Sequence, residues 1–385
     1  MRVLQIHNRY RLPGGEDTLV EDELELLRGR GHEVHQLIFS NPDDVVGSAA
    51  SLAVAPWNST SRARVAAAVR DFKPDVMHVH NTWFRATPAV FRVESDVATV
   101  MSLHNFRLLC VNALLFRSGA TCTDCVGRGP WRGVAHRCYR TGFVPSLAAA
   151  ATISLHRTVD TWSRVDRYVA LTEFVRDIHV QGGVDPSRIS VFPDFADDPG
   201  HRPRPPSRSD YVMYVGRLSI EKGVDTLVEA WLRGPLADLR LVVIGDGPER
   251  ARLESIGAAN VEFRGHVDRE EVTDLMMGAR ALLLPSRCFE GGQPRVLLEA
   301  MGCGLPVVVS DLGGMAETLE NGRVGLLVPV DDVDEWVRVV AALRDDAEVD
   351  RLGDLARRNY EKRHTPAMAA LNLEATYREA MATRV

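Results

Sequence analysis

A proline-rich segment divides this chain into two halves of similar construction. Residues 197–207, Asp-Asp-Pro-Gly-His-Arg-Pro-Arg-Pro-Pro-Ser, are so rich in proline that neither a helix nor a central strand is expected there. On each side, short apolar runs alternate with amphipathic helical patterns, which is typical of a parallel sheet with helices on both faces. At 385 residues the chain exceeds the length over which one hydrophobic core keeps growing, so two domains are expected.

The positions of the apolar runs predict the fold class. The expected strands are residues 3–6, 34–39, 75–79, 97–103, 169–171 and 189–192 in the first half, and 211–215, 239–244, 261–263, 281–284 and 306–309 in the second. This order predicts an α/β protein with two Rossmann-like, doubly wound domains. The expected segments are an N-terminal domain over 1–196 with a cysteine-rich insertion at 105–140, a second domain over 208–365, and a helix over 366–385 that packs back on the N-terminal domain.

Charge and hydropathy exclude several classes of protein. The formal net charge of −6 argues against a general nucleic-acid binder. No apolar run reaches the roughly 18 residues that a membrane span requires. The first residues, Met-Arg-Val-Leu-Gln-Ile, lead directly into a strand without a signal-peptide pattern, so we expect a cytoplasmic protein. Its six cysteines are then expected to be thiols or metal ligands rather than disulfides.

Two Rossmann-like halves raise the possibility of a dehydrogenase, and the turns argue against it. The segment after the first strand, residues 7–16, lacks the Gly-x-Gly-x-x-Gly pattern that brings a backbone close to a pyrophosphate. No acidic residue stands at the end of the second strand, where Ser40 and Asn41 lie. Gly245-Asp246-Gly247 is followed by Pro248 and Glu249 in place of further glycines. A dinucleotide-dependent oxidoreductase is therefore not favoured.

The start of the second half carries the strongest chemical signal. Arg217 and Lys222 follow the strand 211–215 and precede a helix that begins after Gly223. In α/β domains, phosphate groups bind where a strand ends and a helix begins. Only Lys73, Lys222 and Lys362 interrupt an otherwise all-arginine set of basic residues. A lysine kept in this motif indicates that a compact ammonium is needed there, next to a diphosphate.

Four motifs in order resemble the retaining glycosyltransferases of family four, which have the GT-B fold. They are Gly216-Arg217 with Lys222-Gly223, then Gly245-Asp246-Gly247-Pro248, then Leu284-Pro285-Ser286 leading through Glu290 to residues 294–301, and last Gly304-Leu305-Pro306 with Asp311-Leu312-Gly313-Gly314. Gly14-Gly15-Glu16 and Leu103-His104-Asn105 extend the match into the first half. The resemblance implies that the two domains face a central cleft.

The resemblance implies a donor site in the second domain. In the implied reaction, a nucleotide diphosphate leaves the anomeric carbon of the donor sugar, and a hydroxyl of the acceptor attacks on the same face. The expected donor is a UDP-linked sugar. Arg217 and Lys222 would stabilise the charge that builds on the departing phosphate. Glu299 would hold the ribose hydroxyls, and Val296 and Leu297 would lie at the donor beside the amides that open their helix. Because protein cations balance the diphosphate, no catalytic metal is expected.

The spacing of two glutamates leaves one assignment open. Eight residues separate Glu290 from Glu299, one more than the family usually has. Counting back from Glu299 without a gap puts Gly291 in the position that contacts the donor sugar. If the turn holds one extra residue, Glu290 reaches that position itself. We favour Glu290, because a carboxylate is the usual partner for sugar hydroxyls.

The first domain contributes further candidates. His104 ends the fourth expected strand, and in the family a histidine there faces the donor sugar, so we assign His104 to the catalytic site. Gly14 and Gly15 are candidates for bringing backbone amides to the donor phosphates. His78 and His80 alternate on another strand and are expected to be structural.

Four cysteines suggest a metal site. Cys110, Cys122, Cys125 and Cys138 lie in one polar, glycine-rich insertion, with a Cys-x-x-Cys pair at its centre. This spacing resembles that of a zinc ribbon. We therefore expect a structural zinc ion, because the insertion has too few apolar residues for a core of its own.

Two alternatives to transfer remain open from the sequence. An epimerase or hydrolase of the same fold would consume the donor with water alone. A non-catalytic sugar-nucleotide binder is favoured if Gly291 occupies the sugar position. The expected partners are a nucleotide diphosphate-sugar and a hydroxyl-bearing acceptor. The apolar helix over 146–162 is a candidate for lining the acceptor site or for peripheral contact with the inner face of the membrane.

Overall fold

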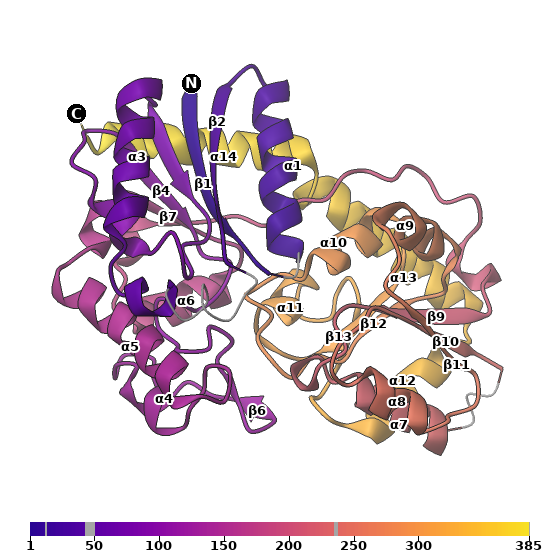
Figure 1. The fold of residues 1–385 in the computed structure, drawn as a ribbon. Coiled ribbons are helices and arrows are strands. Elements are labelled where there is room, and N and C mark those ends of the chain that lie inside the picture. The colour runs from indigo at the N-terminus through magenta and orange to yellow at the C-terminus, as the bar shows by residue number, and fades with distance from the viewer. Residues whose placement is uncertain (12–13, 43–50, 235–237, 385) are drawn as a thin grey trace. The chain divides into compact units, whose positions relative to one another are not determined.

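The computed structural model describes residues 1–11, 14–42, 51–234 and 238–384. These residues form two compact units. The first unit comprises Met1–Leu115, Thr123–Phe192 and Ala369–Val385, and the second comprises Phe116–Cys122 and Pro193–Met368. Figure 1 shows each unit as strands flanked by helices.

A six-stranded parallel sheet forms the centre of the first unit. Its strands, in the order β2-β1-β3-β4-β7-β8, are β2 (Glu33–Ser40), β1 (Arg2–Arg9), β3 (Val76–Val79), β4 (Ala98–Ser102), β7 (Arg167–Ala170) and β8 (Ile189–Val191). Its helices are α1 (Gly15–Gly29), α3 (Ser59–Phe72), α4 (Trp131–Ala135), α5 (Phe143–Thr158), α6 (Glu173–Gln181) and α14 (Pro366–Ala382). A short antiparallel pair, β5 (Phe116–Arg117) and β6 (Ala120–Thr121), interrupts the chain before α4.

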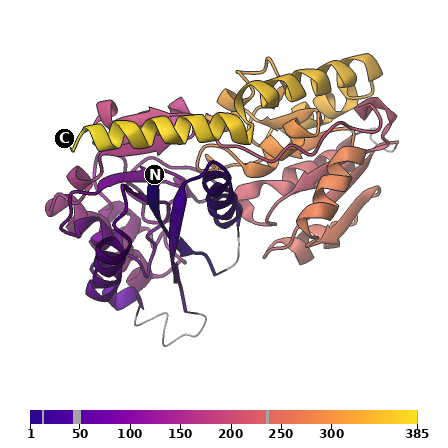
Figure 2. The same ribbon diagram turned by 90° about the horizontal axis from the view of Figure 1, so that it is seen from above.

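The last helix of the chain completes the first unit. Leu373, Tyr377 and Ala380 of α14 belong to one buried cluster with Val3 and Val76 of the sheet. Figure 2 shows the yellow helix lying along the indigo and magenta elements of this unit. The prediction that the C-terminal helix returns to the N-terminal domain is therefore confirmed. The helix α12 (Val333–Ala342), by contrast, packs against α7 (Val224–Arg233) in the second unit.

The second unit repeats the architecture with a second parallel sheet. Its strands, in the order β11-β10-β9-β12-β13-β14, are β11 (Val261–Gly265), β10 (Arg240–Ile244), β9 (Tyr211–Val215), β12 (Leu282–Leu284), β13 (Val307–Ser310) and β14 (Leu326–Val328). Its remaining helices are α8 (Arg250–Ser255), α9 (Arg269–Gly278), α10 (Arg295–Gly302), α11 (Gly313–Thr318) and α13 (Asp346–Arg363). The predicted fold class, two doubly wound α/β domains, is confirmed.

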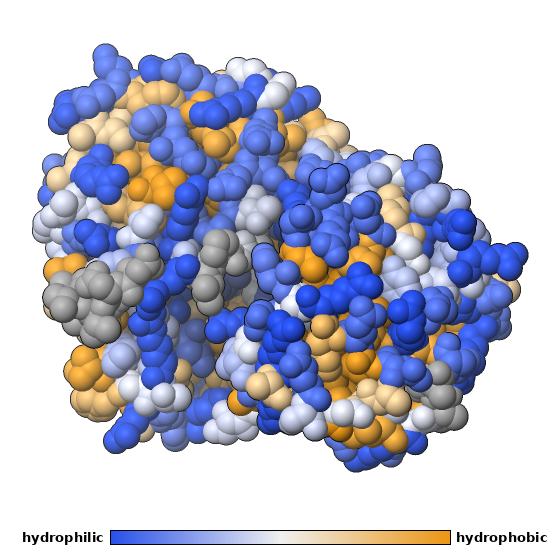
Figure 3. Space-filling view, turned by 45° about the vertical axis from the view of Figure 1, so that its right-hand side comes forward, coloured by the Kyte–Doolittle hydropathy of each residue, from blue (hydrophilic) through white to orange (hydrophobic). Residues whose placement is uncertain are grey.

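The proline-rich segment is bound to the second unit. The Arg202 guanidinium donates hydrogen bonds to the backbone oxygens of Met276 and Ala279. The Tyr360 hydroxyl donates to the carbonyl of Ala196, at the start of the segment. On the face drawn in Figure 3, hydrophilic side chains predominate and apolar ones form separate groups.

Candidate functional site

The strand order of each sheet shows where a ligand site is expected. In the second unit, β10 and β11 lie on one side of β9, whereas β12 lies on the other. The connections after β9 and β12 therefore leave in opposite directions, which opens a crevice at the carboxyl ends of these two strands. The same reversal occurs between β1 and β3 in the first unit. The crevice of the second unit is bordered by Arg217 and Lys222, which follow β9, and by Glu290, which follows β12. The crevice of the first unit lies beside His80, which directly follows β3.

Glycine lets the two loops of the second crevice meet. Gly223 has φ +66°, and a Cβ atom at this position would lie 2.1 Å from the backbone oxygen of Pro285. The backbone N–H of Arg287 also donates to the carbonyl of Glu221, at 2.9 Å. A side chain at residue 223 would force the loops apart, so glycine here is a requirement of packing and of backbone conformation together.

Lys222 and Glu290 form an ion pair in this crevice. Nζ of Lys222 lies 2.5 Å from Oε2 of Glu290, and the Ser286 hydroxyl donates to Oε1. The Glu290 side chain is 8% exposed and that of Lys222 is 27% exposed. Burial alone would lower the pKa of Lys222, but the attraction of Glu290 outweighs it and raises the pKa above its ordinary value. The ammonium is therefore fixed as a charge.

The turn that carries Glu290 has an unusual backbone. Glu290, Gly291 and Gly292 have φ values of 54°, 63° and 120°. Few non-glycine residues in proteins have a positive φ, and those that do are concentrated at functional sites. The turn is held by Gly314, where a Cβ atom would lie 2.1 Å from the oxygen of Gly292. This conformation directs the carboxylate of Glu290 to Lys222, whereas Gly291 contributes no side chain.

Arg217 and Glu299 differ in the number of ion pairs and hydrogen bonds that their side chains make within the protein. The Arg217 side chain is exposed, and no ion pair or side-chain hydrogen bond joins it to the described part of the chain. Oε1 of Glu299 lies 3.0 Å from Nε of Arg295 and 3.7 Å from Nε of Arg269, with the side chain 23% exposed. Glu299 is thus half-buried between two guanidinium groups.

The start of α10 limits two of the predicted donor contacts. Leu297 is fully buried in the core of the second unit, and Val296 is partly buried against the same core. The N–H of Leu297 donates to the carbonyl of Pro294 at 3.0 Å. The Leu297 side chain therefore does not face a ligand in this conformation.

The turn before α1 shows how the Gly14 amide is held. The N–H of Gly14 donates to Oδ2 of Asp17 at 3.0 Å, so this amide is already engaged within the turn. The same carboxylate contacts Nε2 of His7 at 2.8 Å and the N–H of Tyr10 at 3.2 Å. Gly15 is the first residue of α1.

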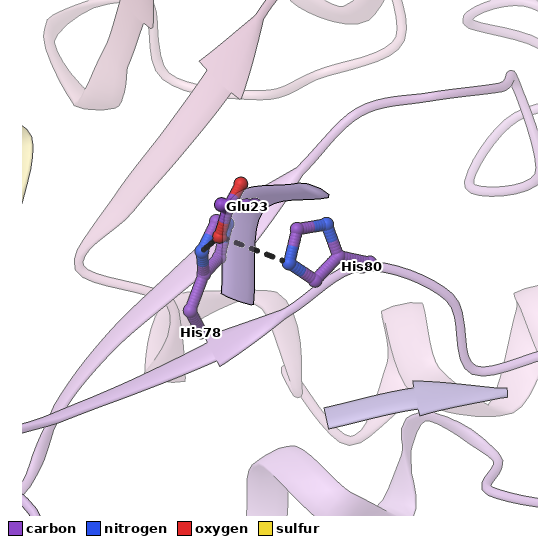
Figure 4. A group of neighbouring side chains, drawn as sticks. All are labelled: Glu23, His78 and His80. Carbon is purple, nitrogen blue, oxygen red and sulfur yellow. Dashed lines mark ion pairs between the residues drawn. The ribbon is translucent and has the colours of Figure 1, made fainter. Parts of the chain in front are cut away.

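His104 lies at one end of a buried polar network. Its Nε2 is 3.0 Å from Nδ1 of His80, and the two rings are stacked with centroids 5.3 Å apart. Nε2 of His80 in turn is 3.4 Å from Oε1 of Glu23, and the same oxygen is 2.9 Å from Nδ1 of His78 (Figure 4). Sequence reasoning did not find Glu23, and it took His78 and His80 as structural. The spacing His-x-His at the end of a strand was the available signal, since it places both rings on one face.

A pocket opens beside His104 in the first unit. His80, Asn81 and Asn105 contribute polar groups to its lining. Trp83 and Ile153 are among its apolar residues, and Ile153 comes from α5. The helix expected over 146–162 therefore lines a pocket. This is what its apolar pattern requires if the helix lines an acceptor site, the first of the two interpretations given above.

The structure does not gather the four cysteines of the insertion. Cys110 and Cys125 are buried, whereas Cys122 and Cys138 are half-buried. Among the described residues, the ligand atoms of three or more His, Cys, Asp or Glu side chains converge only at Glu23, His78 and His80. The four cysteine sulfurs are therefore not among the groups that converge in the described residues, and the structural zinc ion stays a prediction.

Two family models match the chain in succession. Residues 13–198 match the model for glycosyltransferase family 4, and residues 209–346 match that for glycosyl transferases group 1. The chain is 34% identical over 178 residues to an alpha-D-kanosaminyltransferase of Streptomyces kanamyceticus. That alignment covers 44% of this chain and 45% of the relative, so the chain spans less than half the length of that protein.

Solved structures share the fold over the whole chain. Sucrose-phosphate synthase from Thermosynechococcus elongatus has a TM-score of 0.72 at 18% identity, and the match covers 100% of both chains. The Anabaena protein HepE in complex with UDP-glucose has a TM-score of 0.65 at 16% identity, with 97% of this chain and 98% of that one covered. Within the described residues, no helix has the length and apolar character needed to cross a bilayer.

Proposed function

Because the chain belongs to the family-four glycosyltransferases of the GT-B fold, we propose that it transfers a sugar from a nucleotide diphosphate-sugar to a hydroxyl acceptor. We further propose a UDP-linked donor and retention of the anomeric configuration. The observation that carries the proposal is the ion pair between Lys222 and Glu290 at the second unit's crevice. A cation and a carboxylate at this edge suit a diphosphate and a sugar ring that lie side by side.

The leaving group accounts for the two cations. As the bond between sugar and phosphate breaks, negative charge grows on the diphosphate, and a fixed ammonium stabilises that charge without reorganising. Lys222 would release Glu290 in part and engage the phosphate instead. Arg217, which is exposed, would supply a forked set of donors to the same group. We therefore propose that Lys222 and Arg217 balance the charge of the departing diphosphate without a catalytic metal ion.

The two glutamates would hold different parts of the donor. Glu290 would accept hydrogen bonds from hydroxyls of the sugar, and Glu299 from those of the ribose, with Val296 beside it. Both carboxylates already accept from donors in the protein, so a bound donor exchanges partners rather than creating a new demand for hydrogen bonds. HepE, which has a similar fold, was solved with UDP-glucose, and this supports the choice of UDP.

The acceptor would approach from the first unit's pocket beside His104. We propose that His104 contacts the donor sugar or the attacking hydroxyl. Gly14 and Gly15 remain candidates for phosphate contacts through their backbone amides; the Gly14 amide would exchange Asp17 for a phosphate oxygen.

We also propose peripheral contact with an anionic membrane face on the cytoplasmic side. Large apolar side chains are exposed on α4 and α5: Trp131 (55%), Phe143 (53%), Val144 (66%) and Leu147 (39%). Residues 105–157 contain seven arginines and one acidic residue, Asp124. This combination is that of segments that lie in the interface of an anionic bilayer.

Release of free nucleotide tests the function. Purified protein is incubated with UDP-, GDP-, ADP- and TDP-sugars, with and without simple sugars, polyols and alkyl glycosides as acceptors. Release that depends on an acceptor, with the product anomer equal to that of the donor by NMR, supports retaining transfer. Release without any acceptor indicates a hydrolase or epimerase. Donor binding without release indicates a non-catalytic binder.

A further inference from the structure

Three side chains from different elements form a continuous chain of contacts that ends at the pocket. Glu23 comes from α1, His80 follows β3, and His104 follows β4. Oε1 of Glu23 is 3.4 Å from Nε2 of His80, and Nδ1 of His80 is 3.0 Å from Nε2 of His104. Glu23 is 4% exposed and His80 is 2% exposed, so water does not compete for these contacts. Figure 4 shows the carboxylate of Glu23 directed at the rings of His78 and His80.

The proton positions follow from the first member of the chain. Burial alone would raise the pKa of Glu23, but the attraction of His78 and then of His80 outweighs it and holds the pKa well below its usual range. An ionised carboxylate only accepts hydrogen bonds, so Nε2 of His80 carries a proton. Burial, followed by the proximity of His78, lowers the pKa of His80 to about 4, so its ring is neutral at pH 7. Its Nδ1 is then an acceptor.

The same reasoning reaches His104. Since Nδ1 of His80 accepts, Nε2 of His104 must donate across the 3.0 Å contact. Burial and the neighbouring His80 also hold the pKa of His104 well below its ordinary value. A neutral ring protonated on Nε2 has a lone pair on Nδ1. His104 lines the pocket, and no hydrogen bond joins its Nδ1 to the residues that the structure describes.

We infer that Glu23, acting through His80, fixes the Nε2-protonated tautomer of His104, so that Nδ1 of His104 accepts a hydrogen bond from a substrate hydroxyl. The inference rests on the proposed function for the identity of that hydroxyl, and on the geometry alone for the tautomer. Glu23 does not line the pocket, so it is a positioning residue. The same role of a buried carboxylate, to orient an imidazole through its second nitrogen, recurs in enzymes that use histidine.

Neighbouring groups are compatible with this assignment. Nε2 of Gln5 lies 3.4 Å from both Nε2 of His80 and Oε1 of Glu23, and 3.2 Å from the carbonyl of Val20. An amide nitrogen only donates, so a hydrogen bond from Gln5 to Nε2 of His80 would require the opposite tautomer of His80. In the arrangement that we infer, the two protons of Gln5 go to the carbonyl of Val20 and to Oε1 of Glu23 instead. His78 contacts the same oxygen of Glu23 through Nδ1 at 2.9 Å. Its Nε2 lies 2.9 Å from the Ser102 hydroxyl, and its Nδ1 also lies 2.8 Å from the Tyr377 hydroxyl.

The ring nitrogens of His104 provide a direct test. Full-length protein with 15N-labelled histidine is examined by NMR at pH 7.5, and the His104 signals are assigned by their loss in His104→Gln. We expect Nε2 to be protonated and Nδ1 to be unprotonated in the wild type. The amide of Glu23→Gln can donate to His80 as well as accept from it, so it no longer selects one tautomer. The tautomers of His104 should therefore become mixed in this variant. A protonated Nδ1 in the wild type overturns the inference, whether or not the protein transfers sugar.

Kinetics distinguish positioning from a purely structural role. We expect Glu23→Gln to lower kcat by about tenfold or more while the donor KM changes less than about twofold. Glu23→Asp, which keeps the charge, should recover part of the rate. Glu25→Gln on the exposed face of the same helix is the matched control and should leave rate and melting temperature unchanged. A stoichiometric metal that Glu23→Gln loses would mean that the cluster binds a cation and would overturn the inference.

Discussion

The ammonium of Lys222 lies 2.5 Å from the carboxylate of Glu290, across the crevice between β9 and β12. The pair joins two loops that leave the sheet in opposite directions. It also keeps each charge partnered while the site holds no ligand. In the function that we propose, a diphosphate that enters the crevice would compete with Glu290 for the lysine.

Replacement of Lys222 tests the phosphate assignment. Lys222→Ala should lower turnover by about a hundredfold or more, as the loss of one stabiliser of developing charge does. Lys222→Arg should restore only part of the rate, because a planar guanidinium does not replace a compact ammonium. Lys362→Ala, on the exposed surface of α13, is the control and should keep the wild-type rate. Steady-state rates near the wild-type value in Lys222→Ala would refute the assignment.

Replacement of Glu290 and of Glu299 should affect different steps, turnover in the first case and nucleotide affinity in the second. Glu299→Gln should weaken the affinity for free UDP and for the donor alike, because the ribose does not react and its binding is uniform. Glu290→Gln should leave UDP affinity nearly intact and lower turnover, because its target gains charge in the transition state. Calorimetric titration with UDP, combined with steady-state rates, measures both effects. If Glu290→Gln turns over like the wild type, Gly291 occupies the sugar position instead.

Gly223 should not tolerate a side chain. Its φ of +66° and the 2.1 Å approach of the Pro285 oxygen each penalise alanine, and together we expect Gly223→Ala to cost about 2–4 kcal/mol of stability. Gly29→Ala is the control, because nothing lies within 4 Å of the added atom and the position is helical. That control should be neutral or slightly stabilising. Thermal melts of both variants make the comparison, and equal melting temperatures would contradict the prediction.

Buried histidines should make the protein sensitive to acid. Burial lowers the pKa of both His179 and His364 to about 4, from an ordinary value of 6.5. The unfolded chain therefore binds more protons than the folded one between pH 6.5 and 4, so the stability these residues contribute is complete above pH 6.5 and is lost as the pH falls. Each shift corresponds to at most about 3 kcal/mol. Urea denaturation at pH 7.5 and 5.0 measures the loss, and His179→Gln should reduce it; a stability independent of pH would rule out this cause.

The fold was predictable because its signals are local. Apolar runs such as 211–215 and 281–284 are short, bounded by turns and buried on both faces, so each could be identified as a strand without knowledge of its neighbours. The helix α13 was missed for the opposite reason. It carries charged residues at many positions, and only six of its residues, Val349, Leu352, Gly353, Ala356, Asn359 and Tyr360, are buried.

The candidate site was predictable on one unit and not on the other. Arg217, Lys222 and Glu290 belong to motifs that are continuous in the sequence. The contact of Glu23 with His80 joins a helix to the end of a strand more than fifty residues later, and only the crossover between β1 and β3 brings them together. The cysteine spacing predicts a zinc site from separation along the chain alone, and it carries no information on the direction of each side chain. The hydrogen bond between the Gly14 amide and Asp17 could not be predicted, because it depends on how the turn folds onto a side chain of its own.

The return of α14 to the first unit has a consequence for how the protein is made. A ribosome delivers the sheet strands of this unit first and the helix that covers them last, after all of residues 193–368 have been synthesised. At about 5–20 residues per second, this leaves an interval on the order of ten to thirty-five seconds. Throughout it, Val3, Val76 and Val100 lack the cover that Leu373 and Tyr377 later provide. Nascent chains at this stage are natural clients for chaperones that bind apolar strands, and a stalled or truncated message would yield a first unit that stays open.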